Sequence, residues 1–162
     1  MASSNKPGTI SGGCLCGSVR YAVTFPPDHN FVEAASTCQC EQCRKNSGAL
    51  VWTAHRVPLS AITYTSQSTL KRYQATPGMT RGICTECGSF LFWQKESGEA
   101  ISLSVGCFDK EELQNYGTFL ASGKTNLFCS AEIPGVTDYL QGDRWRFDNE
   151  GEGAELLPKR NS

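Results

Sequence analysis

Hydrophobic positions recur along the chain in short segments that alternate with polar positions and end at turn residues. The clearest segment is SVRYAVTF (18–25), in which valine, tyrosine, valine and phenylalanine occupy every second position before Pro26-Pro27. Alternation with a period of two predicts a half-buried strand, and the prolines predict its end. Further segments have strand composition, the last two of them weaker: 49–57, 61–66, 70–75, 89–95, 100–106, 129–133 and 144–147.

One segment predicts a helix, DKEELQNYGTFLA (109–121). Asp109 can cap it, and Glu112 three residues later completes the pattern of a capping box. Gly117 lies inside the segment and disfavours a long helix. Many short strands and one short helix predict a mainly β fold.

Composition and charge narrow the class of partners. The chain has 162 residues, a net charge of −1 and a pI near 6.1. Nucleic-acid binders carry a basic excess, so we expect no nucleic-acid partner. We also expect no membrane partner and a cytoplasmic location, because no apolar run approaches the ~20 residues of a spanning helix and the N-terminus lacks the apolar core of a signal peptide.

The cysteines carry the most specific indication of function in the sequence. There are nine: Cys14, Cys16, Cys38, Cys40, Cys43, Cys84, Cys87, Cys107 and Cys129. An odd count in a mid-sized chain without a signal peptide favours metal binding over a disulfide framework. The first seven fall into three short motifs, CLC, CQCEQC and CTECG, and clustered thiolates favour zinc or an iron–sulfur cluster.

Spacing leaves two partitions of these seven thiols open. In one, the second and third motifs supply a single four-cysteine site through Cys40, Cys43, Cys84 and Cys87. In the other, the first and third motifs form a closed four-thiolate site, and the middle motif holds a second ion with three thiolates. The second partition uses all seven, and it separates a closed structural site from one with a position left for water or substrate.

Four motifs in order carry a family resemblance: GGCLCGSVRY, CQCEQCRKNSGA, RGICTECGSFLF and SVGCFD. With them the chain resembles the glutathione-dependent formaldehyde-activating enzyme and centromere protein V family from about residue 12 to residue 109. The resemblance implies an Mss4-like tent of small antiparallel β-sheets. It also implies two zinc ions per chain, in the second partition.

The ligand sets and the activity follow from the resemblance. It implies a structural zinc ion on Cys14, Cys16, Cys84 and Cys87, and a catalytic-type zinc ion on Cys38, Cys40 and Cys43. The activity that it implies is of the carbon–sulfur lyase type, resembling S-(hydroxymethyl)glutathione synthase, with glutathione as the thiol co-substrate and formaldehyde or a related small electrophile as its partner.

Two departures from the family pattern leave the substrate open. Cys107 stands where Thr or Ser is expected, and the C-terminal third lacks the His that often marks it. The alternatives are a non-catalytic zinc-binding protein-interaction module, or an enzyme on the same scaffold with a different, secondary-metabolic substrate. The sequence does not indicate an oligomeric state.

Other residues have less specific interpretations. Arg44 and Lys45 follow Cys43 directly and are candidates for offsetting negative charge or binding a substrate carboxylate. Cys107, Cys129 and the aromatic residues of the strands are expected in the core, His55 on a partly exposed strand and His29 in a loop. The predicted organisation is a flexible lead-in (1–11), a single zinc-binding β domain (12–150) and a polar tail (151–162).

Overall fold

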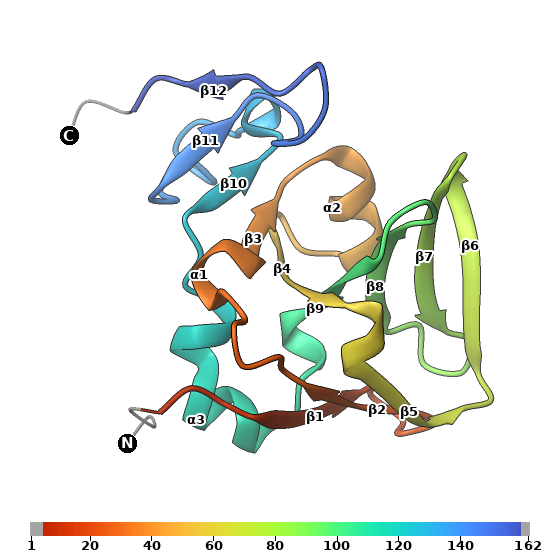
Figure 1. Ribbon diagram of the computed structural model, residues 1–162. Helices are drawn as coiled ribbons and strands as arrows, with labels where there is room; N and C mark the ends of the chain where they lie inside the picture. The colour runs from red at the N-terminus through yellow and green to blue at the C-terminus, as the bar shows by residue number, and fades with distance from the viewer. Residues whose placement is uncertain (1–4, 160–162) are drawn as a thin grey trace.

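The computed structural model describes residues 5–159, which form two β-sheets with three α-helices against them (Figure 1). The strands are β1 (Thr9–Gly13), β2 (Val19–Thr24), β3 (Ala35–Cys38), β4 (Trp52–Pro58), β5 (Ile62–Gln67), β6 (Leu70–Thr76), β7 (Met79–Cys84), β8 (Phe90–Lys95), β9 (Ala100–Ser104), β10 (Thr125–Leu127), β11 (Asp143–Trp145) and β12 (Leu156–Leu157). The helices are α1 (Phe31–Ala34), α2 (Glu41–Ser47) and α3 (Lys110–Ala121).

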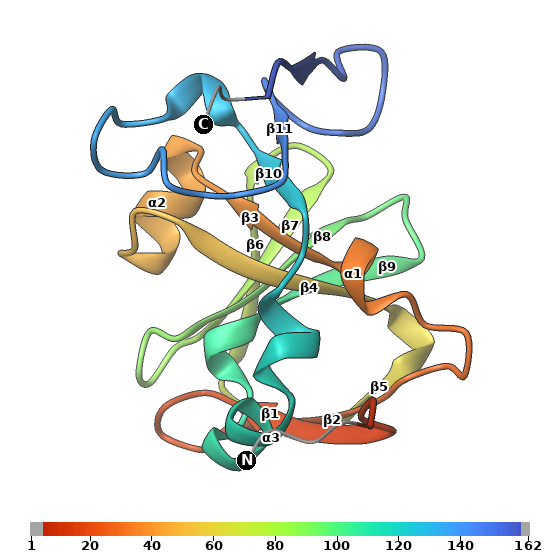
Figure 2. The same cartoon turned by 90° about the vertical axis from the view of Figure 1, so that its left-hand side faces the viewer.

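The two sheets differ in size and composition. Strands β1, β2 and β5 form an antiparallel three-stranded sheet, and the other nine follow the order β12-β11-β10-β3-β4-β9-β8-β7-β6. Strand β10 runs parallel to β3 and extends that sheet into the C-terminal segment (Figure 1). Figure 2 shows the small sheet and α3 at one end of the molecule and β10 and β11 at the other. The predicted mainly β fold is therefore confirmed, with two parallel strand pairs in addition.

Most predicted strands are confirmed, with two kinds of exception. The segment 129–133 is not a strand: Phe128 takes a left-handed conformation (φ 56°), and a 3₁₀ turn at Cys129–Ala131 follows it. Five strands were not predicted: β1, β3 and β7 have small, polar and glycine residues with little alternation, and β10 and β12 have only three and two residues. Strand β1 begins at Thr9, inside the predicted lead-in, and β12 lies in the predicted tail; residues 1–4 and 160–162 lie outside the described residues.

Helix α3 is confirmed, but its predicted capping box is wrong. Asp109 occupies the N-cap position without a side-chain bond to the helix. Its carboxylate instead accepts hydrogen bonds from Arg20 (2.7 Å) and from the Ser11 hydroxyl (2.6 Å). Glu112 accepts a hydrogen bond from the Ser11 amide (3.1 Å). Both acids therefore tie α3 to the three-stranded sheet, where partners in β1 and β2 compete with the helix for them.

The nine-stranded sheet separates two apolar clusters. The larger cluster fills the space between this sheet, the small sheet and α3; at its centre are Val19, Leu91, Phe92 and Leu103. The smaller cluster lies near α2 and contains Cys38, Cys43, Trp52, Ala54 and Phe90. Aromatic strand residues were expected in the core, and Trp52, Phe90 and Phe92 are buried, whereas Trp93 is half-buried. Within residues 5–159, no helix has the length and apolar character needed to cross a bilayer.

Gly123 permits the close approach that starts the C-terminal segment. A Cβ at this position would lie 1.7 Å from the backbone oxygen of Ala35 at the start of β3. Because backbone atoms cannot move aside cheaply, only glycine fits between α3 and β10 without distortion.

We predict opposite effects for two glycine substitutions. Gly123→Ala should lower the free energy of unfolding by about 1–3 kcal/mol through overpacking. Gly117→Ala should raise it by about 0.5–1 kcal/mol, because alanine favours the helix and no atom lies within 4 Å of a Cβ at that position. Denaturant unfolding of the wild type and the two variants measures both changes. Equal stability of the two variants would contradict the close approach at Gly123.

Candidate metal centres

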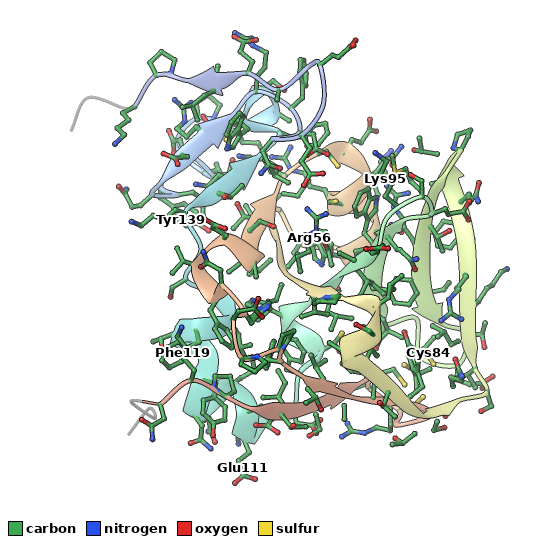
Figure 3. The ribbon with its side chains drawn as sticks, viewed as in Figure 1. Arg56, Cys84, Lys95, Glu111, Phe119 and Tyr139 are labelled. Atoms are coloured by element: carbon green, nitrogen blue, oxygen red, sulfur yellow. The ribbon has the colours of Figure 1, made fainter. Side chains whose placement is uncertain are left out.

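Four thiols from two distant turns meet at one point between the sheets. Cys14 and Cys16 lie in the turn between β1 and β2, and Cys84 and Cys87 lie at the turn between β7 and β8. All four sulfur atoms lie within 4.8 Å of one another. Figure 3 labels Cys84 near the end of β7, with further sulfur atoms close by. The structure thus brings together the first and third cysteine motifs, as the second partition predicts.

The spacing of these sulfur atoms fits a tetrahedral thiolate site. The Sγ atom of Cys16 lies 3.5 Å from that of Cys14 and 3.7 Å from that of Cys84. Ligands at ~2.3 Å from a tetrahedral zinc ion lie about 3.8 Å apart, so the four sulfur atoms need little movement to hold one. Cys14 and Cys84 are buried, while Cys16 is exposed. A four-thiolate site of this kind has no position left for a substrate.

Polar groups lie close to the thiols of this site, while burial raises the pKa of the Cys14 thiol to about 11. The Val19 amide donates to Cys14 Sγ at 3.2 Å, and the Thr69 hydroxyl lies 3.2 Å from Cys84 Sγ. The Ser89 hydroxyl lies 3.3 Å from Cys87 Sγ, and this hydrogen bond lowers the pKa of the Cys87 thiol to about 5. Hydrogen bonds to metal-bound thiolates orient them and spread their charge. The contacts of Cys14, Cys84 and Cys87 are of the kind that would support thiolates bound to a metal ion.

The other three clustered thiols lie where β3 passes into α2. Cys38 ends β3, Cys40 is the N-cap residue of α2, and Cys43 lies in the first turn of that helix. Their sulfur atoms also lie within 4.8 Å of one another. The Cys43 amide donates to Cys40 Sγ at 3.3 Å, so the cap bond of a short helix also fixes the spacing of two thiols.

Hydrogen bonds within the three-thiol group shift the pKa values of Cys38 and Cys40 in opposite directions. Hydrogen bonds from Cys38 and Cys43 lower the pKa of the Cys40 thiol to about 2, and the same bonds together with burial raise the pKa of the Cys38 thiol. Cys38 and Cys43 are buried, whereas Cys40 is half-buried. Three convergent thiols suit a zinc ion. Because zinc usually takes four ligands, these thiols leave one coordination position for a further ligand.

Apolar side chains surround the three thiols. Trp52 lies opposite Cys38 in the β3–β4 register, and Phe90 packs against Trp52 with 5.1 Å between ring centroids. Trp93, Leu127 and Phe128 pack partly buried against the same cluster. Such walls exclude water and strengthen electrostatic interactions at the site.

Arg44 and Lys45, the predicted charged neighbours of the three thiols, make contacts within the protein. The Arg44 guanidinium donates to the backbone oxygens of Leu50 (2.9 Å) and Ala131 (2.8 Å). Lys45 is exposed and pairs with Glu41 at 2.8 Å. Arg44 therefore holds α2 against the C-terminal segment, and the part of either residue in binding a co-substrate stays a prediction.

Gln39, between two of the thiols, was missed by the sequence analysis. Its side chain is fully buried, and its Oε1 atom accepts hydrogen bonds from Thr137 Oγ1 (2.7 Å) and Arg44 Nη2 (3.2 Å). Its partners come from α2 and from the C-terminal segment, so it ties both to the thiol motif. A buried glutamine between two cysteines has no periodic signal that could have revealed it.

The remaining candidates lie outside both thiol groups. Cys129 is buried and Cys107 is half-buried, with its thiol donating to the Phe90 carbonyl at 3.4 Å. His29 lies in a loop as predicted, but the expectation of a partly exposed His55 is wrong, because its side chain is fully buried. His55 Nε2 lies 2.9 Å from His29 Nε2, and its Nδ1 lies 3.0 Å from the Leu120 carbonyl. That carbonyl requires Nδ1 to carry the proton in neutral His55, so His29 donates to His55 Nε2.

Two comparisons with known proteins agree with this arrangement. Residues 9–122 match the model of the family described as "Glutathione-dependent formaldehyde-activating enzyme". A crystal structure of a Rhodobacter sphaeroides protein, a structural genomics target, superimposes with a TM-score of 0.52 at 26% sequence identity. That match covers 62% of this chain and 89% of the Rhodobacter chain. The family match ends at the close of α3, so β10 to β12 lie outside it.

The buried histidine pair predicts a loss of stability in mild acid. Burial lowers the pKa of His55 to about 4 from its ordinary value of 6.5. Between these pH values the unfolded state binds a proton that the folded state does not. The contribution of neutral His55 to the free energy of unfolding is therefore fully present above about pH 6.5 and is lost as the pH falls toward 4. The loss is ~1 kcal/mol per pH unit for each such proton. Unfolding of the wild type and His55→Gln between about pH 7.5 and 5.5 should show a shallower slope for the variant. Equal pH dependence of the free energy of unfolding in the wild type and in His55→Gln would contradict this role of His55.

We also predict that the two thiol groups hold separate zinc ions. Elemental analysis of protein purified without chelator should give two zinc ions per chain, and Cys40→Ser should lose one without unfolding. Cys84→Ser should lose the other ion and should no longer unfold in a cooperative transition, because zinc binding at a closed site contributes folding free energy. Cys107→Ser, a cysteine outside both groups, should keep both ions. Retention of two ions by Cys40→Ser would contradict the three-thiol site.

Proposed function

Because the chain belongs to the glutathione-dependent formaldehyde-activating enzyme family, we propose that it is a zinc-dependent enzyme of the carbon–sulfur lyase type. The proposed reaction joins formaldehyde to the thiol of glutathione, giving S-hydroxymethylglutathione, and reverses that step. The observation that carries the proposal is the group of Cys38, Cys40 and Cys43, three convergent thiols that leave a tetrahedral ion one ligand short.

The residues of this group fit the metal that the family implies. Cys38, Cys40 and Cys43 would hold the ion, and a zinc ion there supplies the positive charge that lets a substrate thiol bind as thiolate at neutral pH. Cys14, Cys16, Cys84 and Cys87 would hold the second, structural ion and keep the sheets in place around the site.

The protein's own contribution is to orient the reactants and to exclude water. The short helix α2 and the end of β3 fix the three sulfur atoms, and half-buried Cys40 marks the side of the group nearest solvent. Trp52 and Phe90 cover the buried side. Holding a thiol and an aldehyde in contact makes their reaction effectively unimolecular, which lowers the entropic cost of the addition.

The atoms of the addition balance without a further reagent. The glutathione sulfur attacks the formaldehyde carbon, and a C–S bond forms. The carbonyl π electrons move to oxygen, which takes up a proton from solvent in place of the one that the thiol released. The reverse reaction breaks the same C–S bond and returns formaldehyde and the thiol.

A specific observation favours a second candidate, an enzyme on the same scaffold with another, secondary-metabolic substrate. The segment beyond the family match adds β10 to β3 beside Cys38 and packs Leu127 and Phe128 against the three-thiol cluster. Phe128 is the one non-glycine residue with positive φ among residues 5–159. Strained residues of this kind persist where the surroundings hold them, often beside a functional site. The electrophile, and not the thiol chemistry, would then differ.

Under either candidate we propose a reducing, cytoplasmic setting. The nine cysteines are free thiols in the structure, and glutathione maintains such thiols in the cytosol.

Exchange NMR of glutathione with formaldehyde tests the proposed reaction. The zinc-loaded protein should accelerate exchange between free glutathione and S-hydroxymethylglutathione beyond the spontaneous rate. Cys40→Ser should abolish the acceleration, because it removes a ligand of the working ion. Cys107→Ser should retain it and serves as the matched control.

Two outcomes would count against parts of the proposal. A spontaneous rate with fully zinc-loaded wild-type protein would remove glutathione and formaldehyde as the reactants. Acceleration that survives in Cys40→Ser would remove the three-thiol group as the site.

A further inference from the structure

Arg81 in β7 is a buried cation without a counter-ion in the described part of the chain. Its side chain is 3% exposed, and its Nε and Nη1 atoms are buried without a hydrogen-bond partner. Its Nη2 atom donates to Gln42 Oε1, an uncharged acceptor. Removing a charge from water is strongly unfavourable unless an opposite charge compensates it. Arg81 lies three residues before Cys84 and belongs to no motif that would single it out in the sequence.

Strand geometry directs Arg81 toward α2 and the three-thiol group. Its neighbour Gly82 faces the larger apolar cluster, since a Cβ at Gly82 would lie 2.2 Å from the Phe92 ring. Successive side chains of a strand point to opposite faces, so Arg81 points to the α2 side. Its register partners on either side are Tyr73 and Trp93.

Contacts from α2 place the guanidinium beside the thiols. Asn46 accepts a hydrogen bond from Tyr73, and Gln42 accepts one from Arg81, so α2 packs directly on this row of the sheet. Gln42 immediately precedes Cys43 in α2, so the hydrogen bond from Arg81 to Gln42 places the guanidinium beside the residue that carries one of the three thiols. Trp93, the register partner of Arg81, packs against the same cluster as Cys38 and Cys43.

We propose that Arg81 is the counter-charge of the three-thiolate metal centre, a positioning residue that stabilises its anionic state. The inference rests on the proposed function and deepens it. Three thiolates around one divalent ion leave one net negative charge, and a substrate thiolate as fourth ligand adds another. In an apolar site this charge is costly, and the unpaired guanidinium offsets it. Arg81 therefore favours an anionic thiolate as the fourth ligand.

The burial of Arg81 distinguishes this role from that of a carboxylate receptor. Its Nε and Nη1 atoms each expose under 1 Å², so a substrate carboxylate cannot reach them in this conformation. Its charge acts on the centre through a site of low dielectric constant, where Coulomb interactions are strong.

A metal-competition experiment tests the proposal without relying on activity. The wild type, Arg81→Met and Arg81→Lys are loaded with two zinc ions and challenged with a chromophoric chelator. Arg81→Met should bind the ion of the three-thiol group about 10–100-fold more weakly, as expected when a supporting neighbour of metal ligands is lost. Its four-thiol ion should be unaffected and reports an intact fold. Arg72→Met, an exposed arginine that packs on Phe92 at the opposite face, should match the wild type.

Arg81→Lys keeps the proposal testable if Arg81→Met fails to fold and loses both ions. Arg81→Lys retains the charge without the planar fork and should keep both ions. Loss of only the three-thiol ion from Arg81→Lys, or wild-type affinity at that group in Arg81→Met, would overturn the counter-charge role.

A spectroscopic measurement separates the counter-charge from substrate recognition. In cobalt-substituted protein, thiolate addition to the three-thiol centre changes the visible ligand-field bands. Arg81→Met should weaken the response to glutathione and to 2-mercaptoethanol by the same factor, because both bring a thiolate. A loss confined to glutathione would overturn the proposal in favour of a carboxylate receptor. These measurements do not require turnover. Failure of the proposed formaldehyde reaction can therefore be distinguished from failure of the proposed role of Arg81.

Discussion

The fold depends on the meeting of four thiols from two turns that lie far apart in the chain. Cys14 and Cys16 come from the small sheet, and Cys84 and Cys87 come from the nine-stranded sheet. Through these residues a metal ion would join the two sheets around the larger apolar cluster. The contacts of Asp109 and Glu112 with β1 and β2 fasten α3 to the same assembly. A chain of this size has a modest core, so one such cross-link contributes strongly to its stability.

The second thiol group lies near the opposite face of the nine-stranded sheet and differs in every physical respect that bears on function. It has three donors rather than four, it lies within one short stretch of chain, and aromatic residues surround it. A local motif of this kind closes no long loop and contributes less to the fold. Its incomplete ligand set instead suits chemistry at the vacant position, with Arg81 supplying the charge that this position needs.

The sequence predicted much of this, and the failures have physical reasons. Local spacing grouped seven cysteines into the motifs CLC, CQCEQC and CTECG but left two partitions open, and the family resemblance implied the grouping that the structure shows. The alternating segments predicted six of the larger strands, and the DKEEL segment predicted α3. The capping box was wrong because Arg20 and Ser11, distant in sequence, bind Asp109 instead. Arg81, Gln39 and the β10–β3 pairing depend on tertiary contacts that have no local pattern.

The central claim, one closed and one open thiolate centre in the same chain, has a direct test in ¹¹³Cd NMR. Cadmium replaces zinc in thiolate sites, and its chemical shift reports the number of sulfur ligands. The account predicts two resonances of equal intensity, one at the shift of a four-thiolate site and one at that of a three-thiolate site. Added glutathione should move only the second toward the four-thiolate position. A single resonance, or two that both ignore added thiol, would contradict the account.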